Sequence, residues 1–173
     1  METNSVVFFN SGEYPELKTK PIIAGWKITN PANIGSLMRL ADNIGCSEVF
    51  ILGEKFDFRK SSIKYTAGQS FETVKLNFIS PEDFFESIPK NHQLVAIETS
   101  EHSKNIFTTP LPSDIIFLLG NERYGLPDDI LNRCKLTVHI PMTGACKSMN
   151  VSHAAAVALF EWQRQQFFLS ATK

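Results

Sequence analysis

Residues 140–156 read IPMTGACKSMNVSHAAA and contain three structural signals in succession. The run that leads into this segment, Leu136–Ile140, is short and apolar, as a strand would be. A polar, glycine-containing turn then extends to Asn150, a residue type that often caps helices, and an alanine-rich helix follows. A strand, a polar loop and a helix in this order form the unit of an α/β domain, in which ligands gather at the carboxyl ends of strands.

The rest of the chain repeats this alternation of short apolar runs and amphipathic stretches. The predicted strands are Pro21–Ala24, Glu48–Leu52, Gln93–Glu98, Ile115–Leu119 and Leu136–Ile140. The predicted helices are Asn33–Ile44, Pro81–Ile88, Pro127–Cys134 and Val151–Phe168, and Lys55–Gln69 is predicted as a surface loop or short helix. The strands are mostly continuous runs of Ile, Val, Leu and Phe, which is typical of a parallel sheet covered on both faces. The sequence therefore predicts an α/β fold with helices flanking a parallel sheet, in one domain.

Composition and charge restrict the class of protein. The 173 residues are 43% hydrophobic and 20% charged, with a formal net charge of −1, as in ordinary globular proteins. This charge gives no overall attraction to nucleic acid, so any such contact must use a local basic patch. Cys46, Cys134 and Cys146 are too few for a disulfide framework, and no signal peptide or membrane-spanning segment is expected. We therefore expect a cytoplasmic protein that does not bind membranes.

Two more polar junctions follow predicted strands. Asn30–Gly35 (NPANIG) leads into the helix that carries Arg39, and Gly120–Pro127 (GNERYGLP) follows the strand Ile115–Leu119. Glycines in such loops let the backbone approach a ligand or adopt positive φ. Any one of these segments by itself is more typical of an ordinary turn than of a binding loop.

Taken together, the three segments resemble the three motifs of the SpoU, or TrmH-like, branch of the SPOUT methyltransferases. The first resembles N-P-x-N-x-G-x-x-x-R-x-A-D, and its matching residues are Asn30, Pro31, Asn33, Gly35, Arg39, Ala41 and Asp42. The second resembles G-N-E-x-x-G-L, from Gly120 to Leu126. The third resembles I-P-M-x-G-x-x-x-S-L-N-V-S-x-A-A-A, from Ile140 to Ala156, with Met149 at the leucine position. The resemblance extends from about Ile22 to Trp162, with the motifs in the family's order.

The resemblance implies a fold, a cofactor and partners that composition does not reveal. It implies a SPOUT-type sheet with a C-terminal trefoil knot, a homodimer, and transfer of a methyl group from S-adenosyl-L-methionine to RNA. The acceptor implied is a ribose 2′-hydroxyl of tRNA or rRNA. Compared with larger relatives, residues 1–173 are expected to contain no additional RNA-binding domain, and the spacing of cysteines and histidines predicts no metal. The residues implied in cofactor binding are Thr99, Leu119, Gly120, Asn121, Ile140, Met142, Ser148 and Met149.

By the same resemblance, Arg39 is the catalytic residue. A guanidinium remains protonated and has no lone pair to accept a proton, so it is a poor general base. We therefore expect Arg39 to hold the phosphate next to the acceptor and to stabilise negative charge on the 2′-oxygen. Asn33 is expected to orient Arg39 or the substrate, and Glu122 to brace its loop, while Ser148 and Asn150 complete the pocket.

The contacts with partners are expected at two places. Arg59, Lys60 and Lys64, together with Lys55 and opposed by Asp57, form the best local basic patch for RNA, although a solvated charged loop explains them equally well. Phe160 and Trp162 on the last helix are expected in the dimer contact.

Three other interpretations compete with a methyltransferase. A non-catalytic RNA-binding module needs no cofactor pocket. A phosphate-binding loop at Gly144–Ser148 lacks the glycine directly before Lys147. A zinc site at Cys134, His139, Cys146 and His153 lacks the usual ligand spacing, and His139 in a strand and His153 on an apolar helix face are more typical of core histidines.

Overall fold

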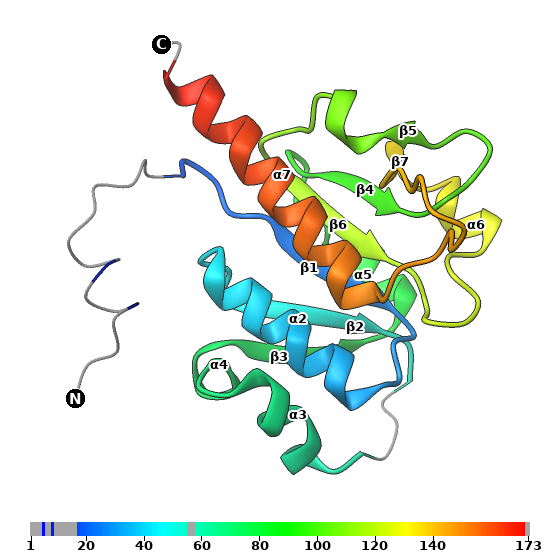
Figure 1. Cartoon of the computed structure of the whole chain (residues 1–173). Helices are drawn as coiled ribbons and strands as arrows, with labels where there is room; N and C mark the ends of the chain where they lie inside the picture. Colours follow the sequence, from blue (N-terminus) through cyan, green and yellow to red (C-terminus); the bar gives the residue numbers. More distant parts are fainter. Residues whose placement is uncertain (1–4, 6–7, 9–16, 55–57, 172–173) are drawn as a thin grey trace.

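Seven parallel strands form one sheet in the computed structural model, which describes residues 5, 8, 17–54 and 58–171 (Figure 1). In their order across the sheet, the strands are β3 (Lys75–Ile79), β2 (Glu48–Leu52), β1 (Ile22–Trp26), β6 (Ile115–Leu119), β4 (Gln93–Ile97), β7 (Leu136–His139) and β5 (Lys104–Asn105). The parallel sheet predicted from the continuous apolar runs is confirmed.

Helices cover both faces of this sheet (Figure 1). One face is covered by α2 (Pro31–Asn43), α3 (Lys60–Ala67), α4 (Ser70–Thr73), the short 3₁₀ helix η1 (Ile106–Thr108) and α7 (Val151–Ala171). The other face is covered by α5 (Pro81–Ser87) and α6 (Asp128–Leu131). Neighbouring strand residues alternate between the two cores: Phe117 packs under α2 and α7, whereas Leu118 packs under α5 and α6. None of the helices in the described ranges combines the length and apolar character needed to cross a membrane.

A proline and a helix cap account for two of the differences between predicted and observed boundaries, whereas α6 ends at Leu131 instead of Cys134 and α7 extends to Ala171 instead of Phe168. β1 begins at Ile22, one residue after Pro21, which has no backbone N–H to donate to the sheet. The helix predicted from Asn33, α2, begins at Pro31 because the Asn30 side chain accepts a hydrogen bond from the Ala32 N–H (2.9 Å), which makes Asn30 its N-cap. The C-terminal helix begins where predicted, since Asn150 accepts from the Ser152 N–H (2.8 Å).

Short edge elements were not predicted. β3 alternates polar Lys75 and Asn77 with apolar Leu76 and Phe78, and among the described strands it pairs with β2 alone. β5 has two residues, too few for a periodic signal. Within Lys55–Gln69, the part that the structure describes contains the short helix α3, so the helical alternative is confirmed there.

The expectation that Trp162 contacts a partner subunit is wrong. Its side chain is 0% exposed, and its indole N–H donates to the Pro112 carbonyl (2.9 Å) inside the subunit. Residues two apart on a helix point about 200° away from each other, so Trp162 and Phe160 cannot face the same way. Phe160 is exposed, as a dimer contact requires.

The order of the strands places the three motifs together. The chain leaves β1 toward β2 on one side, and β6 later pairs with β1 on the other side. The loops that follow β1, β6 and β7 therefore leave the same edge of the sheet, close to the reversal of strand order where open α/β sheets bind ligands.

Candidate active site

A cavity of about 1020 Å³ opens at the carboxyl ends of β1, β4, β6 and β7. Its walls include every residue predicted to bind the cofactor: Thr99, Leu119, Gly120, Asn121, Ile140, Met142, Ser148 and Met149. Four of the five residues predicted for catalysis line it as well: Asn33, Glu122, Ser148 and Asn150. The walls combine apolar strand ends with polar loop groups, as in pockets that bind small organic ligands.

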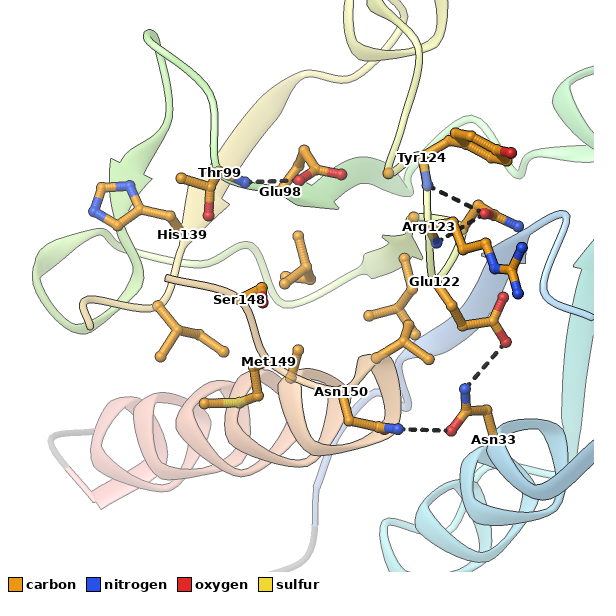
Figure 2. A pocket seen from close by; sticks show the side chains of 18 of the residues that line it. Asn33, Glu98, Thr99, Glu122, Arg123, Tyr124, His139, Ser148, Met149 and Asn150 are labelled. Carbon is orange, nitrogen blue, oxygen red and sulfur yellow. Dashed lines mark hydrogen bonds between the residues drawn. The ribbon is translucent and has the colours of Figure 1, made fainter. Parts of the chain in front are cut away.

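A chain of hydrogen bonds joins the three motifs at one end of this cavity (Figure 2). The buried Asn33 amide donates to Glu122 Oε1 (3.0 Å) and accepts from Asn150 Nδ2 (3.0 Å). Glu122 Oε1 also accepts from the Asn30 N–H (3.1 Å). Asn33 is thus fixed from both sides, and Glu122 ties the second motif to the first.

The second motif folds into a tight hairpin in which Asn121 makes most of the hydrogen bonds. Asn121 and Gly125 exchange backbone hydrogen bonds (3.1 and 3.0 Å), and Gly125 has a φ of +64°, which favours glycine. The Asn121 side chain donates to the Lys27 carbonyl (2.6 Å) and accepts from the N–H groups of Arg123 and Tyr124 (3.0 and 3.2 Å). Asn121 therefore closes the hairpin, binds the backbone of its tip and ties it to the residue after β1.

Glu98, which the sequence analysis did not single out, supports this hairpin from β4. Its carboxylate accepts from the Leu126 N–H (2.9 Å) and the Thr99 N–H (3.0 Å). A Cβ on Gly120 would lie 2.8 Å from Glu98 Oε2, and one on Gly125 would lie 2.5 Å from it. The carboxylate thus occupies space that only glycine leaves open. The rule that functional residues follow strands points to Glu98, because it comes directly after β4.

Replacing Glu98 with alanine is expected to lower the free energy of unfolding by about 1–3 kcal/mol, because the Leu126 N–H loses a charged acceptor. Hydrogen exchange at the Leu126 amide should become faster, as measured by NMR together with urea denaturation. Glu101→Ala is the matched control: this exposed carboxylate has no hydrogen-bond partner among the described residues, so stability should change by less than about 0.5 kcal/mol. Unchanged exchange at Leu126 in the Glu98 variant would contradict the bracing role.

The third motif forms a loop whose backbone is open to a ligand. From Met142 to Met149, no backbone N–H donates to another backbone group within the described part of the chain. Ser148 and Met149 lie along the cavity wall, next to the helix α7 that Asn150 caps (Figure 2). This loop can offer N–H groups to a bound molecule without breaking secondary structure.

Arg39 lies apart from the cavity walls. It is exposed on α2, six residues after Asn33, and therefore about 9 Å further along the helix. It has no ion pair or hydrogen bond with any residue that the structure describes. Asn33 was expected to orient either Arg39 or the substrate, and the structure shows no contact between Asn33 and Arg39.

The expected basic patch is weaker than the sequence suggested. Lys64 pairs with Glu72 (2.6 Å), so its charge is largely offset. Arg59 and Lys60 are exposed at the start of α3, away from the cavity walls. Lys55 and Asp57 lie outside the described residues.

The histidines and cysteines are dispersed. His139 lines the cavity and its Nδ1 hydrogen-bonds to the Ser103 hydroxyl (2.9 Å), whereas His153 is exposed, so its expected place on an apolar helix face is wrong. Burial raises the pKa of the Cys134 thiol to about 11. A metal site requires at least three ligand side chains close together, and the described residues contain no such group of His, Cys, Asp or Glu.

Comparison with known proteins identifies this arrangement. Residues 20–160 match the SpoU rRNA Methylase family. A 23S rRNA (uridine(2479)-2′-O)-methyltransferase of Streptomyces viridochromogenes is 30% identical over 144 residues, which cover 80% of this chain and 50% of that protein. The chain thus spans about half the length of such curated relatives.

Solved structures share the fold. An AdoMet-bound rRNA methyltransferase from Sinorhizobium meliloti superposes with a TM-score of 0.77 at 26% identity, covering 88% of this chain and 58% of that one. A structure that describes 2-OH methylation of C/U34 on tRNA superposes with a TM-score of 0.78 at 24% identity. The match covers 86% of this chain and 97% of that one, and it is a likeness of fold alone. The family match includes all three motifs that line the cavity. The chain therefore belongs to the SpoU rRNA Methylase family.

Proposed function

We propose that this protein transfers a methyl group from S-adenosyl-L-methionine to a ribose 2′-hydroxyl of RNA. One observation carries the proposal: three sequence motifs that lie far apart along the chain line one cavity, and the residues implied in cofactor binding all belong to its walls. The substrates in the names of the relatives, rRNA and tRNA, define the class of acceptor that we propose for this chain.

The cavity fits a nucleoside-type cofactor. Ile97, Leu119 and Ile140 give it apolar surface for a flat base, and the open backbone of the third motif offers N–H donors. Close packing at Gly120, where a Cβ would lie 2.8 Å from the Gly125 backbone, keeps the wall free of side-chain bulk. When bound there, S-adenosyl-L-methionine supplies an electrophilic methyl group.

The chain's own residues position the acceptor and stabilise charge. Asn33 and Asn150 are held rigidly at the cavity end, so they orient a ligand with little loss of entropy on binding. We place the phosphate next to the acceptor outside the cavity, over α2, because α2 begins at the cavity with Asn33 and carries Arg39 beyond its walls. Arg39 is exposed there and without an ionic partner among the described residues, so it can clamp that phosphate and stabilise the developing 2′-oxyanion.

The assembly is also part of the proposal. The large apolar side chains Phe160, Phe168 and Leu169 are exposed on α7, which supports a homodimer contact along this helix. The late strand β7 pairs between the earlier strands β4 and β5, and the loops of the second and third motifs line one cavity, which supports the family's C-terminal knot. The cysteines of the chain are all free, which supports a reducing, cytoplasmic location.

The direct test combines binding with product analysis. Calorimetry should show uptake of S-adenosyl-L-methionine and of its demethylated product, S-adenosylhomocysteine. After incubation with tRNA and rRNA, mass spectrometry of the digested nucleosides should show a 2′-O-methylated nucleoside. RNA binding without uptake of either compound would instead favour a non-catalytic RNA-binding module.

A further inference from the structure

The tip of the second-motif hairpin presents two side chains that the rest of the fold does not use. Tyr124 is 86% exposed, and Arg123 is exposed beside it. Neither side chain makes a hydrogen bond, an ion pair or a ring contact with the residues that the structure describes. Both nevertheless line the cavity.

The backbone under these two side chains is held firmly. The Asn121 side chain accepts from both of their N–H groups, and the Asn121–Gly125 bridge closes the hairpin. Glu98 fixes the exit of the hairpin at Leu126, and Glu122 fixes its entry to the first motif. A well-anchored turn that projects an unused aromatic ring and an unused guanidinium is preorganised for a ligand.

The position of the tip indicates which ligand group it meets. Figure 2 shows Arg123 beside Glu122, on the side of the cavity where Asn33 lies, and Tyr124 on the same hairpin but further from Asn33 and Asn150, whereas His139 and Thr99 lie on the opposite side. This is the end from which α2 leads toward Arg39. The tip thus borders the mouth of the cavity on the side proposed for the acceptor.

We propose that Tyr124 and Arg123 form a platform for one unpaired nucleotide of the RNA substrate, with the tyrosine ring stacked on its base and the guanidinium on its phosphate. This inference rests on the proposed RNA methylation and narrows the substrate to RNA that is unpaired at the acceptor. Aromatic rings and arginine planes bind splayed-out bases, and the face of a base inside a duplex is covered by its neighbours. Arginine holds phosphate in a bidentate manner.

The experiment measures RNA affinity by fluorescence anisotropy in the presence of S-adenosylhomocysteine. The probes are a stem-loop RNA with 2-aminopurine in its loop and a fully paired duplex of the same composition. Tyr124→Ala should weaken binding of the stem-loop about tenfold and abolish quenching of the 2-aminopurine, while Tyr124→Phe should bind within about twofold of the unaltered protein. Arg123→Ala should lower the slope of log affinity against log salt by about one.

Tyr65 supplies the matched control, because it is 92% exposed on α3 and does not line the cavity. If Tyr124→Ala and Tyr65→Ala bind the stem-loop equally, or if Tyr124→Ala weakens duplex and stem-loop alike, the platform is overturned while the proposed function stands. If the unaltered protein binds neither S-adenosylhomocysteine nor RNA, the proposed function itself fails, and the platform fails with it.

Discussion

Replacing Arg39 with lysine is expected to lower the turnover number of methyl transfer about 100- to 1000-fold while leaving the affinity for S-adenosylhomocysteine within about twofold. Removing one donor that stabilises a developing oxyanion typically costs this much. Lysine keeps the positive charge but loses the planar fork that holds a phosphate through two parallel hydrogen bonds. Because Arg39 lies outside the cavity walls, cofactor binding should not depend on it.

The measurement is single-turnover methyl transfer to RNA, combined with calorimetry of S-adenosylhomocysteine binding. Arg133→Lys is the matched control, since Arg133 is also exposed but far from the cavity. Its guanidinium carbon lies 3.6 Å from the centroid of the Phe85 ring, near the amino ends of β4 and β7. The control should keep near-normal turnover. A similar result for Arg39→Lys would show that the forked geometry is irrelevant, and equal losses in both variants would show a general effect of surface charge.

Strands that are buried on both faces could be predicted from the sequence, and those at the edges could not. Ile115–Leu119 is apolar at every position because both helical layers cover it, so its bounds agree with the prediction. β3 has one neighbouring strand and alternates polar with apolar residues over five positions, a pattern that short loops share. Boundaries moved where a proline or a cap intervened, as at Pro21 and Asn30.

The same distinction applies to the site. Residues of the three motifs could be predicted to meet, since parallel strands end at one edge of the sheet. The role of Glu98 depends on its packing against Gly120 and Gly125, a contact between segments more than 20 residues apart in the sequence. The exposure of Tyr124 likewise depends on how Asn121 closes the hairpin, and the pattern of apolar residues in the sequence does not predict that turn.

Replacing Trp162 with alanine is expected to lower the free energy of unfolding by about 3–5 kcal/mol, the usual cost of deleting a large buried aromatic side chain. The indole is fully buried between α7 and the sheet, and the Pro112 carbonyl would lose its donor. Domains of this size are stable by only about 5–15 kcal/mol, so the variant should unfold at a much lower urea concentration. Trp162→Phe keeps most of the apolar contact and should lose about 1–3 kcal/mol, because the Pro112 carbonyl is left without its donor.

Phe160→Ala separates burial from subunit contact, because Phe160 is on the same helix, two residues away, but is exposed. In the monomer, this variant should change stability by less than about 1 kcal/mol, since little apolar area is buried there. If α7 forms the dimer contact, light scattering should show weaker association for Phe160→Ala. Trp162→Ala, in contrast, should lower the stability of each subunit whether or not the subunits associate. Equal and small losses of stability in both variants would show that the indole is not part of the core, and the prediction would be wrong.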